Sequence, residues 1–439
     1  MHEDGETRLG TATRGFELAA EITLKTLDRR RHLYVVGKTG TGKSTFLRGL
    51  MLDDFANGRP FAFIDPLGPN AEILIDNVPP EFVNDIRYLE LADTSYPRGL
   101  NPLHNIRPAQ RALVASQILS AFQGLFGGSL ADWPRLSYIL QNSVLLLLHS
   151  PGETLLGLSR LLVDERYRRR LLKNCSDPVV RAYFETEFAD YERSFMTIAI
   201  APVQNKIGLV LTESIRLMLG QRRSTIDVRA IVRDSKYLIV NLSKGRVGPT
   251  TAYLAGAFIL SQLSQAAEER AALPAHQREQ LRDFTVYADE VQDYVTSSFG
   301  ETLSQARNGF INFCIAHQYL DQLPDGLLPA ILGNVGNIIG FRIGASDAAK
   351  LAPEMGFESV NAFTDLANYT ARALLLRDGE PLEPMLLSIP EPQPEHHGQL
   401  ASVIARSRST YSRPRQIVEN MIEEQMGRAD ERPDDRGRR

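Results

Sequence analysis

The sequence has 439 residues, a formal net charge of −4, 43% hydrophobic residues and 23% charged residues. This composition is typical of a soluble globular protein with one large domain or two domains of ordinary size. The small negative charge excludes a global attraction to nucleic acid, so any contact with DNA requires a local group of basic side chains.

The two cysteines, Cys175 and Cys314, are too few for a disulfide framework and do not have the spacing of metal ligands. The acidic, polar start of the chain is unlike a signal peptide. The longest apolar runs, such as Val144–Leu148, are far too short to cross a bilayer. We therefore expect a cytoplasmic protein without a transmembrane segment.

The first elements in the chain follow the order strand, loop, helix, strand. After a polar lead with one helix in residues 1–30, the short apolar run Leu33–Val36 opens into a glycine-rich loop. A helix is predicted over Lys43–Leu52 and a second strand over Phe61–Ile64, which ends at Asp65. This order is the opening βαβ unit of a parallel sheet.

The middle of the chain differs in character from both sides. From residue 108 to residue 218, Leu, Ala, Arg and Glu dominate and apolar residues recur at helical spacing. Strand-like runs then return at Tyr237–Leu242, Phe284–Ala288, Ile311–Ala316 and Ile338–Ile343.

We therefore predict an α/β protein with a largely parallel sheet. Its core is expected in residues 31–107 and 219–390, interrupted by an all-helical domain in residues 108–218. Residues 391–439 are rich in Pro, Arg, Glu and Asp and are predicted to form a mobile charged tail with a short helix.

The strongest local motif follows the first strand of the core. It fits G-x-x-x-x-G-K-[ST] and consists of Gly37, Lys38, Thr39, Gly40, Thr41, Gly42, Lys43, Ser44 and Thr45. In such a loop, backbone N–H groups and the start of the next helix face phosphate oxygens. Lys43 is expected to reach the β- and γ-phosphates of ATP, and Ser44 to hold Mg²⁺. A flexible glycine turn is the alternative, but the strand before and the helix after the loop favour the phosphate site.

A second motif places two acids at the end of a hydrophobic strand. Phe284–Ala288 is followed by Asp289 and Glu290, and ligands of open α/β sheets bind beyond the carboxyl ends of the strands. Asp289 is expected to bind Mg²⁺ and Glu290 to orient and deprotonate the attacking water. Surface strands also end in acids at turns, and Asp65 is a competing acid at another strand end.

Two polar residues flank the next strand. Gln318 follows Ile311–Ala316 and could sense the γ-phosphate, or be an ordinary polar residue at a strand end. Arg307 precedes the same strand. It could complete the site of a neighbouring subunit by stabilising charge on the transferred phosphoryl group, or be a solvated surface charge.

The combined motifs resemble those of the conjugative coupling ATPases of type IV secretion, within the HerA/FtsK superfamily of DNA-pumping P-loop ATPases. The likeness covers most of residues 28–390. It is carried by Asp28–Gly37 leading into the glycine-rich loop, Ile64–Pro66, Gly99–Leu103, Val240–Gly245, Ala316–Leu320, Asn334–Asn337, Phe341–Arg342 and Asp347–Ala348.

The resemblance implies a RecA-like motor domain that carries an all-helical domain and assembles as a homo-hexamer around DNA. It further implies that Arg307 acts in trans and that Gln318 matches the glutamine of the family. One departure is that Asp65–Pro69 keeps the first acid of the family's pattern and loses the last.

The function expected from the sequence is an ATPase that translocates DNA, with ATP and Mg²⁺ as cofactors and catalysis by Lys43, Glu290, Arg307 and Gln318. Assembly only on DNA, and recruitment to the inner membrane by a partner, are left open. A relaxase, a secretion channel or a nuclease are the candidate protein partners. Two alternatives stay open: a HerA-like helicase in DNA repair or phage defence, and a non-motor nucleotide-binding scaffold.

Overall fold

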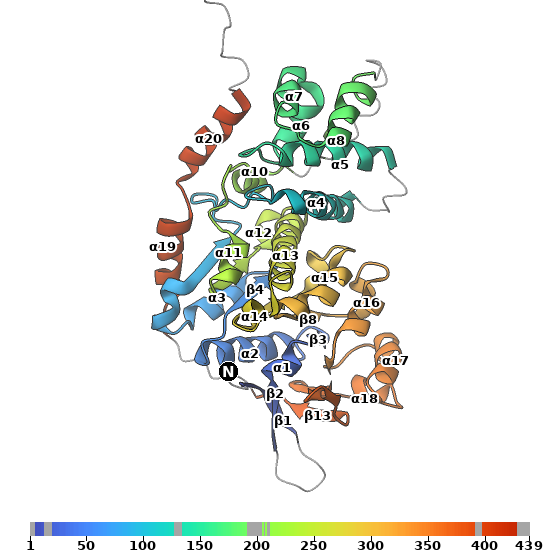
Figure 1. The fold of residues 1–439 in the computed structure, drawn as a ribbon. Coiled ribbons are helices and arrows are strands. Elements are labelled where there is room, and N and C mark those ends of the chain that lie inside the picture. Colours follow the sequence, from blue (N-terminus) through green and yellow to red (C-terminus); the bar gives the residue numbers. More distant parts are fainter. Residues whose placement is uncertain are drawn as a thin grey trace, which may run out of the picture. The chain divides into compact units, whose positions relative to one another are not determined.

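The computed structural model describes residues 5–12, 20–126, 134–190, 204–205, 207–208, 211–390 and 397–427. The chain divides into two compact units. The first consists of Met1–Glu90, Val228–Arg246 and Gln262–Ser407, and the second of Leu91–Asp227, Val247–Ser261 and Arg408–Arg439. Figure 1 shows the fold and labels many of its helices and strands.

The first unit contains an 11-stranded sheet in the order β2-β1-β13-β10-β9-β3-β8-β7-β4-β6-β5. Its strands are β1 (Glu6–Ala12), β2 (Ala20–Lys25), β3 (Leu33–Val36), β4 (Phe61–Asp65), β5 (Ile86–Glu90), β6 (Tyr237–Asn241), β7 (Phe284–Ala288), β8 (Ile311–His317), β9 (Asn337–Gly340), β10 (Thr370–Leu374) and β13 (Met385–Ser388). The short strands β11 (Leu376–Arg377) and β12 (Glu380–Pro381) form a separate pair.

The part of the sheet from β9 to β5 is parallel, whereas β10, β13, β1 and β2 extend it in antiparallel fashion. Every residue of β3, β4, β6, β7, β8 and β9 is buried. Burial on both faces is why these strands appear in the sequence as continuous apolar runs. The α/β class with a largely parallel sheet is confirmed.

The register of the parallel strands decides which residues meet at each edge of the sheet. Val36 pairs with His317, and Ala288 pairs with Ile315. The segments that follow β3, β7 and β8 therefore all leave the sheet at its carboxyl edge. The segments that precede these strands lie at the opposite, amino edge.

The helices of the first unit are α1 (Thr26–Arg29), α2 (Lys43–Ala56), α3 (Pro69–Asp76), α11 (Val228–Arg233), α12 (Lys244–Val247), α14 (Ala275–Arg278), α15 (Phe299–Ala306), α16 (Leu327–Asn334), α17 (Ala345–Glu354) and α18 (Asn361–Thr364). Two further helices, α13 (Pro249–Ala271) and α19 (Leu400–Tyr411), run past the boundaries of this unit, as does the last residue of α12. Short 3-10 turns are η1 (Pro80–Asp85), η5 (Val291–Asp293), η6 (Arg307–Gly309) and η7 (Leu320–Gln322).

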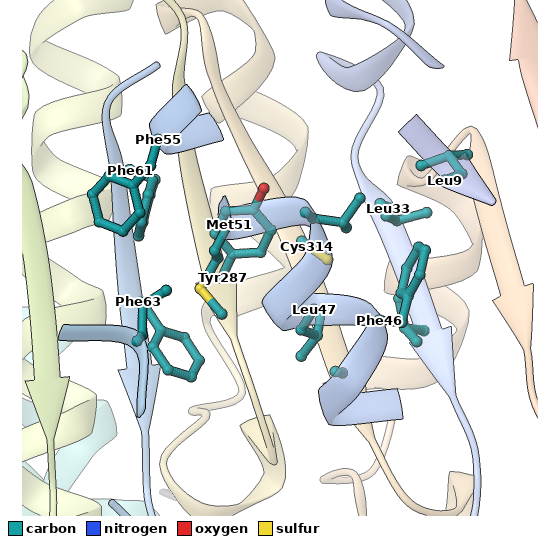
Figure 2. Packing of buried hydrophobic residues seen from close by; sticks show 14 of the residues in the cluster. Leu9, Leu33, Phe46, Leu47, Met51, Phe55, Phe61, Phe63, Tyr287 and Cys314 are labelled. Atoms are coloured by element: carbon teal, nitrogen blue, oxygen red, sulfur yellow. The ribbon is translucent and has the colours of Figure 1, made fainter. Parts of the chain in front are cut away.

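The hydrophobic core fixes α2 against the sheet. Figure 2 shows Met51 and Phe55 of this helix beside the aromatic side chains of β4 and β7. The rings of Phe55 and Phe61 lie 4.9 Å apart, and those of Phe61 and Tyr287 lie 5.6 Å apart. Each such buried side chain contributes about 1.5–3 kcal/mol through removal of apolar surface from water. This packing fixes the position of α2, which starts at Lys43, relative to β7.

A buried charge pair joins the far end of α2 to the same strand. The guanidinium of Arg29 donates to both carboxylate oxygens of Asp54, at 2.7 and 2.9 Å. It also donates to the Tyr287 hydroxyl at 2.8 Å, and this hydroxyl donates to Asp54 at 2.7 Å. Asp54 is fully buried. Such a pair is costly to break, because either charge alone would be left without a partner.

The N-terminal segment differs from the prediction of one helix in a polar lead. Residues 6–25 form the hairpin strands β1 and β2, and only four residues of α1 follow. Leu9 and Leu24 point into the core. The register of the pair shifts between Arg8 and Gly10. This irregularity breaks the alternation of polar and apolar residues, which is the sequence signal of a strand.

The second unit is helical and has no strand among its described residues. Its helices are α4 (Arg111–Phe126), α5 (Pro134–Leu148), α6 (Gly157–Val163), α7 (Glu165–Leu172), α8 (Pro178–Ala182), α10 (Glu213–Leu219) and α20 (Arg415–Gly427), with the short helices η2 (Pro108–Gln110) and η4 (Tyr183–Glu187). No helix in the described part of the chain is long and apolar enough to span a membrane.

The limits of this unit differ from the 108–218 predicted for an all-helical domain, because segments distant in the sequence join it. Ser261 donates to Gln117 at 2.7 Å, and Arg415 forms an ion pair with Glu213. Composition alone does not reveal such contacts.

The C-terminal segment also differs from the prediction of a mobile tail with one short helix. Within residues 397–427 the structure has two helices, α19 and α20, of 12 and 13 residues. Val403 and Val418 are buried. Each lies in a short apolar run, beside Ile404 and Ile417 respectively, and runs this short are a weak periodic signal. The remainder of the tail, residues 391–396 and 428–439, lies outside the described residues.

Candidate nucleotide-binding site

The glycine-rich loop connects β3 to α2 at the carboxyl edge of the sheet. Gly40 and Gly42 have φ angles of 78° and 114°, in the left-handed region that side chains disfavour. At Gly37, a Cβ atom would lie 2.5 Å from the Cβ of Phe341, so the loop approaches its neighbour too closely for any larger residue. The Thr41 hydroxyl donates to the Lys38 carbonyl at 2.7 Å and closes the loop on itself.

The loop surrounds the beginning of α2. Lys38, Thr39 and Gly40 are exposed, and Ser44 and Thr45 are partly buried in the first turn of the helix. The first N–H groups of a helix have no acceptor within it, and the helix dipole is positive at this end. The backbone therefore presents donors and positive potential where phosphate oxygens would lie.

Lys43 joins this loop to the two acids after β7. Its Nζ lies 2.7 Å from Oε1 of Glu290 and 3.3 Å from Oδ1 of Asp289. Ser44 Oγ donates to Oδ2 of Asp289 at 3.4 Å. The structure thus brings together two pairs of adjacent residues, Lys43–Ser44 and Asp289–Glu290, that lie almost 250 positions apart in the sequence.

Glu290 is held in an unusual backbone conformation. Its φ of 42° and ψ of 52° are left-handed, which costs a residue with a side chain about 1 kcal/mol or more. Its carboxylate accepts from Nε2 of Gln318 at 3.2 Å and from Nε2 of Gln292 at 2.8 Å. The strained backbone and the two amides aim this carboxylate at the lysine.

The charges of the site shift one another's pKa values. Burial alone would lower the pKa of Lys43, but the adjacent Asp289 and Glu290 raise it. For Glu290, burial opposes ionisation but the ion pair with Lys43 and the hydrogen bonds of Gln292 and Gln318 outweigh it, so its pKa is lowered. Burial raises the pKa of Asp289, and Lys43 offsets only part of this effect. At neutral pH the site therefore holds a charged lysine and an ionised Glu290.

Gln318 is placed by a buried network on the two strands behind it. Tyr34 on β3 lies 2.5 Å from Nε2 of His317, and Nδ1 of His317 lies 3.0 Å from the Tyr319 carbonyl. Burial lowers the pKa of His317 to about 4, so its ring is neutral. Neutral imidazole donates to the carbonyl through Nδ1–H and accepts a hydrogen bond from the Tyr34 hydroxyl at Nε2. This network orients the turn that begins at Gln318.

Sequence reasoning did not identify Gln292, Tyr34 or His317 as parts of the site. Gln292 follows Glu290 by two residues, and a polar residue there in a 3-10 turn carries no distinct signal. The Tyr34–His317 contact depends on the pairing of β3 with β8, which a single sequence does not reveal. The signal in the sequence for His317 is that this polar residue ends the apolar run of β8 and directly precedes Gln318.

The carboxylate of Asp65 forms no hydrogen bond or ion pair with Lys43. Its two carboxylate oxygens accept the backbone N–H groups of Leu67 at 3.0 Å and Ala71 at 2.9 Å. The side chain thereby closes the turn after β4 and caps the start of α3. This geometry fits the strand-end turn and not the competing catalytic role.

Arg307 lies at the other edge of the sheet. It follows α15 and precedes β8, whereas Gln318 follows that strand. Seven residues of strand at roughly 3.3 Å each separate the two edges by about 20 Å. An arginine side chain cannot cover this distance, so the structure does not bring Arg307 to the Lys43 site of its own chain.

The donor set of the site suits Mg²⁺ as a partner of phosphate. Ser44 and Asp289 offer a hydroxyl and a carboxylate, and Mg²⁺ prefers such oxygen ligands together with waters and substrate phosphates. The described residues contain no group of three or more His, Cys, Asp or Glu that could hold a metal ion. The hydroxyl of Ser44 and the carboxylate of Asp289 fit a metal that is bound jointly by protein and nucleotide.

The fold of this chain is similar to the folds of several solved structures. The chain is similar to the bacterial conjugative coupling protein TrwBdeltaN70 in its unbound form, with a TM-score of 0.62, 13% identity, and coverage of 90% of this chain and 94% of the other. It is also similar to plasmid coupling protein TrwB in complex with ADP and Mg²⁺, with a TM-score of 0.60, 14% identity, and coverage of 91% and 98%.

A third similar structure is VirB4 of Thermoanaerobacter pseudethanolicus, with a TM-score of 0.55, 13% identity, and coverage of 90% and 99%. No protein-family model and no curated protein matches the sequence. At these identities the likeness concerns the fold, and it confirms the RecA-like P-loop fold expected from the sequence.

Proposed function

We propose that this chain is an ATPase of the conjugative coupling type, which uses ATP hydrolysis to translocate DNA. The observation that carries the proposal is the convergence of Lys43, Ser44, Asp289 and Glu290 at one edge of the sheet. The fold adds support, because a similar coupling protein has been solved in complex with ADP and Mg²⁺.

The glycine-rich loop is the proposed phosphate site. The N–H groups of Gly37–Thr45 and the first turn of α2 would bind the phosphate oxygens of ATP. Lys43 would leave the two carboxylates and contact the β- and γ-phosphates. This exchange replaces one set of negative partners by another, so the buried ammonium never loses its counter-charge.

Ser44 and Asp289 are the proposed ligands of Mg²⁺. When bound with the nucleotide, the ion would neutralise charge on the phosphate oxygens. Burial raises the pKa of Asp289 by more than the charge of Lys43 lowers it. A divalent cation at this position would add further positive charge.

Glu290 is the proposed general base. Lys43, Gln292 and Gln318 lower its pKa, and the two amides would still favour the ionised form after Lys43 turns to the phosphates, as a base that accepts a proton from water requires. The water oxygen would bond to the γ-phosphorus as the bond to the bridging oxygen of ADP breaks, with the water proton passing to Glu290. Gln318, which already donates to this carboxylate, would report the presence of the γ-phosphate.

Arg307 is proposed to act on the nucleotide of a second copy of the chain. Its position at the amino edge of the sheet prevents a role in its own site. A homo-hexameric ring in which one subunit's amino edge faces the next subunit's Lys43 would provide the contact. The same ring would enclose DNA, with contacts from local groups of basic side chains, because the net charge of −4 gives no global attraction to nucleic acid.

ATP hydrolysis measured with and without DNA tests the proposal. Wild-type protein is expected to hydrolyse Mg-ATP faster when DNA is present, and Lys43→Ala is expected to abolish the activity. Lys236→Ala, which removes the same charge from a lysine paired with Asp85, is the matched control. Hydrolysis that DNA leaves unchanged would support a non-motor scaffold instead.

A further inference from the structure

A buried acceptor lies beside the proposed general base. Gln292 belongs to η5, and its Nε2 donates to Oε2 of Glu290 at 2.8 Å. A carboxylate only accepts hydrogen bonds, so the amide nitrogen of Gln292 faces Glu290 and the amide oxygen is left for another donor. This oxygen, Oε1, is buried and accepts no hydrogen bond from any residue that the structure describes. Most buried carbonyl oxygens are hydrogen-bonded, and an exception beside a catalytic group indicates a donor that binds during function.

The turn that carries Gln292 is fixed by its neighbours. The Asp293 N–H donates to the Glu290 carbonyl at 3.0 Å, and the Asp293 carboxylate forms a 2.7 Å ion pair with Lys244. Tyr294 is fully buried, and its hydroxyl donates to the backbone carbonyl of the residue before Glu290 at 3.0 Å. These contacts hold the backbone of the turn, so Gln292 is placed before any substrate arrives.

The two carboxylate oxygens of Glu290 have different partners. Oε1 accepts from Nζ of Lys43 at 2.7 Å and from Nε2 of Gln318 at 3.2 Å, whereas Oε2 accepts from Gln292. In the function proposed above, Lys43 turns to the phosphates of ATP, and Oε1 then loses its shortest partner. Oε1 can therefore accept a hydrogen bond from water while Oε2 stays bonded to Gln292.

A water molecule that attacks phosphorus needs two acceptors. A lone pair of the water oxygen must point at the phosphorus atom, so both O–H bonds point away from the phosphate group. In a buried site, each O–H bond without an acceptor costs free energy. Glu290 supplies one acceptor, and Gln292, whose amide is bonded to the same carboxylate, carries the second.

We propose that Gln292 holds the attacking water together with Glu290, with Oε1 of Gln292 accepting a hydrogen bond from the second O–H. This inference rests on the proposed function and adds a catalytic residue to it. The water oxygen bonds to the γ-phosphorus, and the bond from phosphorus to the bridging oxygen breaks, with its electron pair leaving on ADP. One water proton passes to Glu290. The O–H held by Gln292 stays on the phosphate product, so Gln292 takes up no proton.

Two substitutions separate the oxygen of this amide from its nitrogen. Gln292→Met keeps the length of the side chain and removes both polar atoms, whereas Gln292→Lys keeps a donor for Glu290 and has no acceptor. Both are expected to lower kcat for ATP about tenfold or more and to leave KM within about twofold, because the lost hydrogen bond orients the water and not the nucleotide. Gln416→Met, which changes an exposed glutamine bonded to Asn420, is the matched control.

The affinities for two analogue complexes give a second measurement. ADP with aluminium fluoride mimics the transferred phosphoryl group with the attacking water in line, and ADP with beryllium fluoride mimics bound ATP. The ratio of the two affinities in one protein does not depend on how much of a variant is folded. Both Gln292 variants are expected to bind the aluminium fluoride complex about tenfold more weakly relative to the beryllium fluoride complex.

A wild-type ratio and wild-type kcat in Gln292→Lys overturn the inference, because a donor to Glu290 is then sufficient. The same result in Gln292→Met overturns it as well, because neither polar atom is then needed. If the wild-type protein hydrolyses ATP and these variants match it, only the inference fails. If the wild-type protein does not hydrolyse ATP, the proposed function fails and this inference fails with it.

Discussion

Nζ of Lys43 lies 2.7 Å from Oε1 of Glu290, and both side chains are buried. The lysine comes from the start of α2 and the glutamate from the end of β7, so their contact depends on the packing of these elements. Tyr287 of β7 and Asp54 of α2 share a hydrogen bond behind the site and hold the two elements together. The nucleotide site is therefore supported by the core that lies beneath it.

Replacement of Glu290 by glutamine is expected to preserve ATP binding and to reduce turnover by about 100-fold or more, because a positioned general base is lost. The amide keeps the size of the side chain, and Lys43 loses only one of its two negative partners. Binding by calorimetry and steady-state hydrolysis measure the two effects. Glu354→Gln, an exposed glutamate on α17, serves as control. Normal turnover in Glu290→Gln would assign the base to another residue.

Gln318→Ala is expected to move the acid limb of the pH–rate profile to higher pH. The hydrogen bond from Gln318 helps to lower the pKa of Glu290, so its removal raises that pKa. Hydrolysis requires ionised Glu290, and the ionised fraction falls as pH falls through the pKa. The variant should therefore lose activity at a higher pH than the wild type. An unchanged acid limb would mean that Gln318 does not act through this carboxylate.

Mixing Arg307→Ala with Lys43→Ala subunits is expected to restore part of the hydrolysis that each variant lacks alone. The amino edge of one chain lies about 20 Å from its own site by the length of β8, so only a second copy can supply the arginine. ATP hydrolysis measured over a range of mixing ratios checks this. Absence of rescue at every ratio would argue against a role in trans.

Asp54→Asn is expected to lower the free energy of unfolding by about 3–5 kcal/mol, because it leaves the buried Arg29 charge without a counter-charge. The adjacent Asp53→Asn removes a partly exposed partner of Arg59 and is expected to cost less than about 1 kcal/mol. Urea denaturation followed by circular dichroism compares the two variants. Equal effects would show that the Arg29–Asp54 pair contributes no special stability.

Stability is expected to fall as the pH is lowered from 7.5 to 5. His32 and His317 are buried, and burial lowers the pKa of each to about 4. The unfolded chain binds protons at its ordinary histidine pKa of about 6.5, so acid favours unfolding across this interval. Each histidine contributes roughly 2 kcal/mol of the loss at pH 5. In His317→Gln, the fall in unfolding free energy should be smaller, and an identical pH dependence would contradict the assignment.

The sequence by itself determined the local features of this protein. The glycine-rich loop is contiguous, and its φ angles at Gly40 and Gly42 follow from residues that lack a side chain. The buried parallel strands could be recognised in the sequence as apolar runs, because both of their faces are covered. Asp289 and Glu290 could be predicted as a pair because they directly follow such a strand.

Strand order and register determine which side chains meet across the sheet, and only the tertiary structure decided these contacts. The pairing of β3 with β8 brings Tyr34 to His317 and so orients Gln318. The same order puts Arg307 at the opposite edge, beside Arg31 and Arg278. Hydrogen bonds between strands are made by backbone groups that every residue carries, so a single sequence does not state which strands are neighbours. The partners of a site that spans several strands are set by the fold as a whole.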